Sequence, residues 1–175
     1  MSPLKKLVFI ATLSLSLNQQ FARAASNDDK DVAAIREVVE AFRISIIKKD
    51  KATFVNLFYS DNPDHMAWQF VDDDIRVARF SKFAPEARKA LRVPDSNYLT
   101  FIDGIIKNST EPSEEIFRNV IIDTDGEIAS VNFDYSFLSD GKEMNWGREM
   151  WHLVRTEEGW KIISVIFSQR DPVSK

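Results

Sequence analysis

Few side chains in this sequence have both the type and the setting that acid–base chemistry needs. Glu149 falls in an alternating, strand-like stretch, and Asp103 lies at the edge of an apolar helical stripe. Burial of either carboxyl would raise its pKa and let it act as an acid or a base near neutral pH. Tyr135 could present its hydroxyl to a ligand beside such a carboxyl. The structural alternatives are an outward Glu149 paired with a surface cation, a solvated Asp103 and a core ring at Tyr135.

Other reactive groups and motifs are absent from the sequence or too far apart in it, and this excludes several classes of site. The sequence has no cysteine, so disulfides, zinc–thiolate sites, iron–sulfur clusters and thiol nucleophiles are ruled out. His65 and His152 are far apart and have no Asp or Glu at metal-ligand spacing, so we assign no metal and no cofactor. Phosphate-loop, serine-elbow and zinc-protease motifs are also absent from the sequence. Catalytic residues therefore stay unassigned.

Aromatic side chains indicate a site more strongly than the titratable groups do. Several could line a concave apolar pocket with a few polar tips, which is the usual composition of a small-molecule site. An equally simple alternative is that these rings only fill the core. The candidate ligand-binding residues are Trp68, Phe70, Asp103, Phe133, Tyr135, Trp146, Glu149, Trp151 and Ser164.

The N-terminus has the three parts of a secretory signal peptide. Two lysines precede an apolar stretch over 7–17, and an Ala-x-Ala end follows at Ala24. The apolar stretch is shorter than the ~20 residues that a membrane-spanning helix needs. We predict a signal peptide over 1–24, cleaved after Ala24 or one residue later, and a single domain over 25–175. The expected location is periplasmic or secreted.

Net charge limits the possible partners. The full chain carries −4; loss of 1–24 removes three of the 23 basic residues and none of the 27 acidic ones, which leaves −7. An acidic chain without a clustered basic run is a poor partner for nucleic acid or an anionic membrane. We therefore expect no nucleic-acid partner, and no membrane partner once the signal peptide is removed.

Two helices are predicted at the start of the mature chain. Apolar residues recur at steps of three and four over 32–46, which predicts one face of an amphipathic helix. Ser26 or Asn27 could cap this helix, and Asp50 could cap a short second helix with Phe58 on its inner face.

The middle of the chain is less regular. Residues 65–71 and 75–80 predict a hairpin of two strands joined through the aspartates at 72–74. A helix capped by Ser96 follows.

The second half predicts a meander of long strands. Turn-forming clusters that contain glycine separate the strands, as in sequential antiparallel hairpins. Helices first and a meander last is the outline of an α+β domain with its helices on one sheet face. The predicted strands are 116–123, 127–138, 144–155 and 160–167.

The strand over 144–155 has two conflicting registers. A tight turn on its N-terminal side pairs Tyr135 with Trp146 and directs Trp146 inward. Pairing on its other edge directs Glu149 and Trp151 inward instead. Glycine within a strand often marks a bulge that shifts the parity by one. We therefore predict a bulge at Gly147, with Trp146 inside before it and Glu149 and Trp151 inside after it.

Both sides of the last strand are apolar. One parity, with Trp160, Ile162, Ser164 and Ile166, is predicted to face inward. An exposed apolar stripe on the back of a sheet invites a partner. We therefore expect a homodimer through the outward parity, Ile163, Val165 and Phe167.

This layout resembles the nuclear transport factor 2-like superfamily, which includes ketosteroid isomerases and polyketide-cyclase-like proteins. The similarity covers residues 30–60 and 115–168 and includes the Gly-Trp-Lys-Ile stretch at 159–162. It implies a curved antiparallel sheet wrapped around a long N-terminal helix, forming a conical cavity, often in a dimer. Ketosteroid isomerase-like members carry a carboxylate base where this chain has Trp68 or a neighbour, so we transfer no catalytic residue.

These observations predict an exported protein that binds a small apolar or aromatic molecule in an aromatic-lined cavity. Two alternatives stay open. One is a lyase or isomerase that transfers protons in the same cavity, with Glu149 or Asp103 as base and Tyr135 as donor. The other is a dimeric interaction module that uses the back of the sheet. The sequence leaves open whether the protein is an enzyme.

Overall fold

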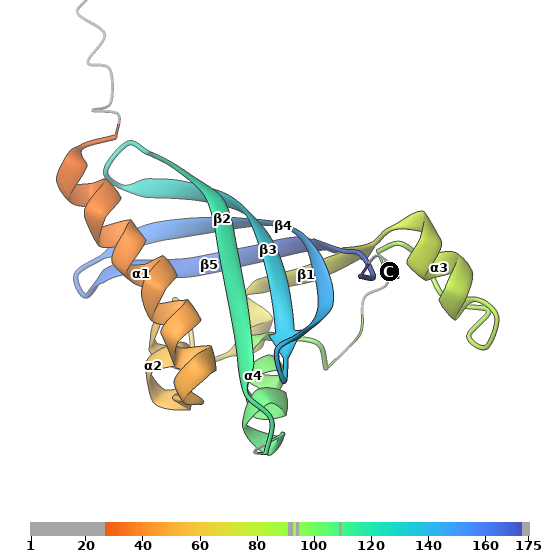
Figure 1. Ribbon diagram of the computed structural model, residues 1–175. Coiled ribbons are helices and arrows are strands. Elements are labelled where there is room, and N and C mark those ends of the chain that lie inside the picture. The colour runs from red at the N-terminus through yellow and green to blue at the C-terminus, as the bar shows by residue number, and fades with distance from the viewer. Residues whose placement is uncertain (1–26, 91–92, 94, 109, 173–175) are drawn as a thin grey trace, which may run out of the picture.

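A curved five-stranded sheet partly encloses the N-terminal helix (Figure 1). The computed structural model describes residues 27–172 except 91, 92, 94 and 109; the predicted signal peptide lies outside the described residues. Strand order is β1-β5-β4-β3-β2, with β1 parallel to β5 and the other pairs antiparallel. The predicted α+β class is confirmed. The elements are α1 Asp29–Lys48, α2 Lys51–Asn56, the 3-10 turn η1 Pro63–His65, β1 Ala67–Asp72, α3 Asp74–Phe80, α4 Tyr98–Lys107, β2 Ser113–Thr124, β3 Ile128–Ser139, β4 Lys142–Thr156 and β5 Gly159–Gln169.

Helix α1 forms where the apolar spacing predicts it. The side chain of Asp28 caps it by accepting a hydrogen bond from the Lys30 N–H, one residue later than the latest predicted cap. Its buried face contacts β2 and β5. The ring of Phe42 lies 4.7 Å from the Trp151 ring, centroid to centroid, and joins the helix to the middle of the sheet. No helix in the described part of the chain is both long and apolar enough to cross a membrane.

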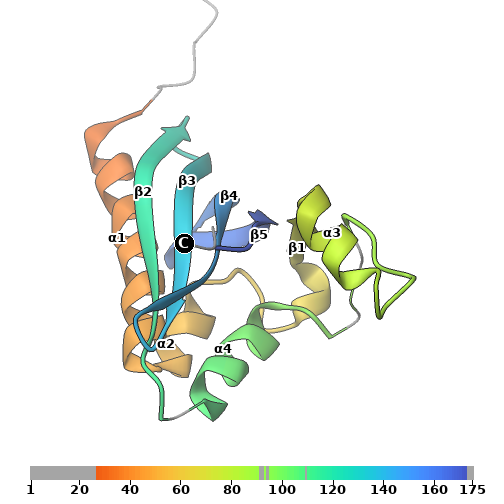
Figure 2. The same cartoon turned by 45° about the vertical axis from the view of Figure 1, so that its right-hand side comes forward.

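Helices α2 and α4 close one end of the sheet (Figure 2). Asp50 caps α2 as predicted, through its carboxyl and the Thr53 N–H at 3.0 Å. Helix α4 is capped by Asn97, one residue after the predicted cap, because Asn97 and Thr100 form a reciprocal capping box. The Tyr98 hydroxyl donates to the Ser60 carbonyl at 2.5 Å, which ties α4 to the loop after α2.

The predicted hairpin over 65–80 is wrong in its second half. Residues 74–80 form helix α3, which projects beyond the end of the sheet. The Asp73 carboxylate accepts the Arg76 N–H at 2.8 Å and so caps the helix rather than making a strand turn. The Arg76 side chain also pairs with Asp72 at 2.7 Å and with Asp171. Strand β1 pairs instead with β5.

The predicted bulge at Gly147 is also wrong. Pairing of β3 with β4 is regular through this point, with Tyr135 opposite Gly147. The extra residues lie elsewhere, at Met144 in β4 and at Ile163 in β5. Trp146 therefore lies on the outer face, 36% exposed, and not inside as predicted.

Trp160 and Ile162 are buried as predicted, but the bulge at Ile163 reverses the predicted faces of the last strand after that point. Ile162 is buried before the bulge, and Val165 is buried after it. Phe167 also faces the concave side, while Ile166 lies outside. The predicted outward stripe through Val165 and Phe167 is therefore wrong. The homodimer itself stays a prediction.

Gly147 is required by a close backbone approach. A Cβ atom at this position would lie 1.9 Å from the carbonyl oxygen of Ser168. The same carbonyl accepts the Tyr135 hydroxyl at 3.0 Å. Glycine inside a strand marks either a bulge or such an approach, and here it marks the approach.

The variant Gly147→Ala should therefore be destabilised by about 1–3 kcal/mol, because the new methyl forces the backbone at Ser168 to move. Urea unfolding measures this change. Gly104→Ala in α4 is the matched control: an added Cβ meets nothing within 4 Å, so helix propensity should stabilise that variant by about 0.5–1 kcal/mol. A Gly147→Ala protein as stable as the wild type would contradict the close approach.

Candidate functional site

A hollow of about 460 Å³ lies on the concave side of the sheet, with α4 as one wall. All five strands contribute to it, because curvature brings their inner faces toward one space. Buried and half-buried polar groups lie among its rings. The residues that define it are Trp68, Phe70, Asn97, Phe101, Glu115, Tyr135, Phe137, Asn145, Glu149 and Phe167.

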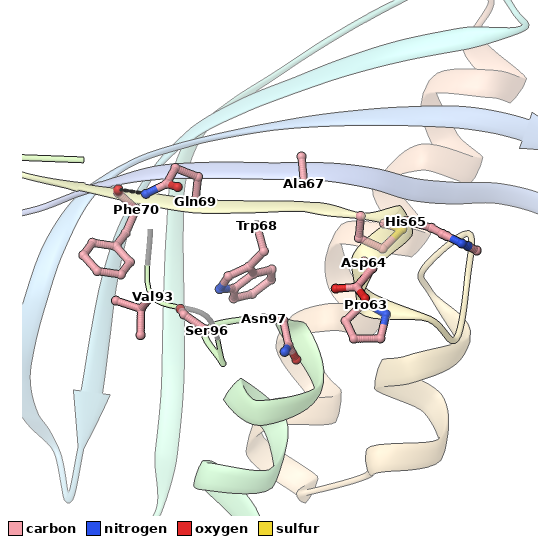
Figure 3. Close-up of a pocket in the computed structure, with 11 residues that line it drawn as sticks. Pro63, Asp64, His65, Ala67, Trp68, Gln69, Phe70, Val93, Ser96 and Asn97 are labelled. Carbon is pink, nitrogen blue, oxygen red and sulfur yellow. Dashed lines mark hydrogen bonds between the residues drawn. The ribbon is translucent and has the colours of Figure 1, made fainter. Parts of the chain in front are cut away.

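A second hollow, of about 480 Å³, adjoins the first along β1 (Figure 3). The two share four lining residues, Trp68, Phe70, Ser96 and Asn97. In Figure 3 the Trp68 indole points from β1 toward the start of α4. Its ring lies 5.5 Å from Phe101 and 5.7 Å from Phe167, so Trp68 forms part of the wall between the two spaces.

Glu149 is a buried carboxyl held in a fixed position. It is 4% exposed, and its Oε2 accepts the Trp151 indole N–H at 2.7 Å. Trp151 is itself fully buried and packs edge-on against Phe133 at 4.9 Å. Burial raises the pKa of Glu149 to about 7, and the Trp151 hydrogen bond opposes the rise. This group can therefore hold or release a proton near neutral pH.

Glu115 is a second buried carboxyl, and it lies just before the strand predicted at 116–123. It is 4% exposed, and among the described residues its Oε2 has no hydrogen-bond partner. Burial and the negative charge of Glu149 raise the pKa of Glu115 well above its ordinary value. Two carboxyls that line one hollow thus disfavour each other's ionisation.

The bulge in β2 explains why Glu115 was missed. The pairing register with β3 shifts between Arg118 and Ile121, and Asn119 has a positive φ of 55°. Alternation therefore breaks in the middle of the strand, and 116–123 carries no single apolar face. The sequence signal that could have placed Glu115 on the inner face is its period-two spacing from Phe117, before the bulge.

Tyr135 lies beside these carboxyls but does not present a free hydroxyl proton. Its side chain is 3% exposed, and its hydroxyl donates to the Ser168 carbonyl at 3.0 Å. Burial, and then the charges of Glu149 and Glu115, raise the pKa of the phenol, so it stays protonated. Its oxygen can accept a hydrogen bond from a ligand, but its proton is already engaged.

Of the predicted site residues, the structure brings Trp68, Phe70, Tyr135 and Glu149 together around the inner hollow. Trp151 contacts Glu149 from the core behind it. Phe133 is buried in the same core and packs against Phe117 at 4.3 Å.

The other three predicted residues lie away from the hollow. Asp103 is on the exposed side of α4 and pairs with Lys51 at 2.6 Å, which is the solvated alternative. Trp146 lies on the outer face, where its indole N–H donates to the Asp171 carbonyl at 3.1 Å. Ser164 is half-buried in β5, between β1 and β4.

Searches against protein-family profiles and against curated proteins found no match. Solved structures do match. A nuclear transport factor 2-like protein of Pseudomonas putida superposes with a TM-score of 0.58 at 11% identity, over 85% of this chain and 97% of that one. A cystatin-like-fold protein of the same kind from Novosphingobium aromaticivorans gives 0.57 at 12% identity, over 83% and 85%. A Streptomyces avermitilis protein, proposed to be a dehydratase of that family, gives 0.56 at 19%, over 82% and 99%.

These matches define the fold. The protein is a curved-sheet α+β domain of the cystatin-like type. More specifically, it has the nuclear transport factor 2-like fold, and the resemblance noted in the sequence is confirmed at this level.

The buried carboxyls make stability depend on pH. The ordinary pKa of Glu149 is 4.5, and in the folded protein it rises to about 7. At Glu149 the folded state thus binds more protons than the unfolded state between these values, so the stability that this group contributes is complete below pH 4.5 and is lost as pH rises through 7. One pKa unit corresponds to about 1.4 kcal/mol, so Glu149 alone should account for a loss of roughly 2–3 kcal/mol between pH 5 and 8.

Urea unfolding at pH 5 and pH 8 tests this dependence. Glu149→Gln should reduce the loss, because the neutral amide does not titrate but can still accept the Trp151 N–H, while Glu115 keeps its own contribution. Glu157→Gln, in the exposed turn between β4 and β5, is the matched control and should leave the loss unchanged. Equal pH dependence in both variants would contradict the assignment.

Proposed function

We propose that this protein binds a small, largely apolar or aromatic molecule in the inner hollow, with a hydrogen-bond donor of that molecule at the two carboxyls. The observation that carries the proposal is Glu115 Oε2, buried at the hollow without a partner in the described part of the chain. An unsatisfied buried polar group costs about 1–3 kcal/mol. A bound donor would recover this cost.

The size and lining of the hollow support the same proposal. Its volume of about 460 Å³ falls within the range of roughly 300–1,000 Å³ that is usual for small-molecule sites. Rings from four elements surround the carboxyls and offer flat apolar surfaces to an aromatic ligand. These rings are Trp68, Phe70, Phe101, Phe137 and Phe167.

The experiment compares two tryptophan variants. Trp68→Ala removes a ring from the wall of the hollow, whereas Trp146→Ala removes one from the outer face. With 2-naphthol as probe, calorimetry should show at least about tenfold weaker binding for Trp68→Ala, a loss of ~1.4 kcal/mol. Trp146→Ala should bind like the wild type. Equal affinities in all three proteins, or no binding to the wild type, would rule out the proposed site.

A second candidate function is proton-transfer catalysis by a lyase or isomerase in the same hollow. It is supported by the pKa of about 7 at Glu149, which suits a general base. A structural relative is itself proposed to be a dehydratase. In this reading Glu149 is the base, while Tyr135 accepts rather than donates a hydrogen bond. Chemical change of a bound compound, followed by NMR, would favour this candidate over simple binding.

We also propose that the protein is exported to the periplasm or beyond, on the basis of the signal-peptide pattern over 1–24. When the full-length gene is expressed in a Gram-negative host, the protein should be recovered from the periplasmic fraction. Intact mass should match a chain that starts at residue 25 or 26. A full-length cytoplasmic product would contradict export.

A further inference from the structure

The ionisable groups that line the inner hollow are acidic. Its ionisable lining groups in the described residues are Glu115, Glu149 and Tyr135, and no described Lys, Arg or His lines it. Its remaining polar groups are neutral hydroxyls and amides from the strands and α4. Nothing within the described lining can therefore neutralise an ionised Glu115 or Glu149.

Two arginines near Tyr135 are engaged elsewhere. Arg76 and Arg170 both influence Tyr135 electrostatically. Arg76 is held by Asp72 and Asp171. The Arg170 guanidinium lies 5.1 Å from the centre of the Trp146 ring, on the outer face, and donates to the Ser168 hydroxyl at 2.9 Å. Neither arginine lines the hollow.

A neutral donor would satisfy Glu115 Oε2 but would not neutralise the negative charge of the ionised carboxylates. A bound cation would satisfy this oxygen and also attract both carboxylates, which favours their ionised forms. Aromatic faces attract cations as well, within about 6 Å of a ring centre. A carboxylate or phosphate ligand would meet only like charge.

We propose, resting on the proposed function above, that the inner hollow recognises a protonated amine attached to an aromatic body. The ammonium group lies at Glu115 and Glu149, and the aromatic body lies among Trp68, Phe101 and Phe167. Two observations carry this assignment independently of each other: the unpartnered, buried Glu115 Oε2, and an aromatic lining that contains acids but no described cation.

Binding of such a cation is coupled to proton release. At pH 5.5 the raised pKa of each glutamate keeps the carboxyls largely protonated, and an ammonium ligand must displace those protons. At pH 8 more of the Glu149 population is already ionised. Affinity for an amine should therefore rise between pH 5.5 and 8, whereas affinity for an uncharged alcohol should not.

Three compounds with one indole-ethyl body separate the possibilities: tryptamine is a cation, tryptophol is neutral and indole-3-propionate is an anion. Calorimetry at pH 8 should show tryptamine binding at least about tenfold more tightly than tryptophol, and the anion most weakly. Lowering the pH to 5.5 should weaken tryptamine binding about tenfold and leave tryptophol binding unchanged.

Variants locate the effect. Glu115→Gln and Glu149→Gln should each reduce the preference for tryptamine over tryptophol about tenfold, while tryptophol binding shows that the hollow is intact. Asp103→Asn is the matched control, since this acid lies on the exposed side of α4 and pairs with Lys51. It should keep the full preference.

The outcomes distinguish this inference from the proposed function. If tryptophol binds as tightly as tryptamine, or the anion binds best, the amine inference is wrong and the binding function stands. If Asp103→Asn alone removes the preference, the amine binds at α4 and the inference is again wrong. If none of the three compounds and no 2-naphthol binds to the wild type, both proposals fail.

Discussion

The indole of Trp151 connects the apolar core of this protein to its polar hollow. One part of the ring packs against Phe42 of α1, at 4.7 Å between ring centres. Its only donor, the indole N–H, is directed to Glu149 at 2.7 Å. Because Trp151 is fully buried, the helix, the sheet and the carboxyl have one mutually consistent arrangement.

The second constraint is the burial of like charges at the same place. Folding gains little from placing Glu115 and Glu149 in a hollow without a described cation, since dehydration disfavours their ionised forms. The aromatic cluster around Phe42 and Trp151 offsets this penalty. Groups whose pKa is strongly raised in a cleft are concentrated at functional sites. Stability therefore does not explain why both carboxyls are buried here.

The sequence alone predicted the parts of the fold that follow local periodicity. The spacing over 32–46 and the alternation along β3 gave α1 and the inner face of the sheet, and pairing at the far edge of β4 directed Glu149 inward. Predictions failed where one residue changes the phase of a strand or where a side chain bonds a distant element. Arg76 of α3 pairs with Asp171, and Gly147 makes room for Ser168; neither partner is visible in local sequence.

The phase changes also explain how one sheet supplies both a filled core and a hollow. The central strands β3 and β4 keep one parity from Val131 and Leu153, near α1, to Tyr135 and Glu149 at the hollow. The flanking strands β2 and β5 each shift by one residue on the way. A bulge bends its strand and increases the local twist.

Without the shift in β2, Glu115 and Ile122 could not both face the concave side. Without the shift in β5, Ile162 and Phe167 could not do so. Two single-residue bulges therefore let these strands direct apolar residues to the core at one end, and Glu115 and Phe167 to the hollow at the other.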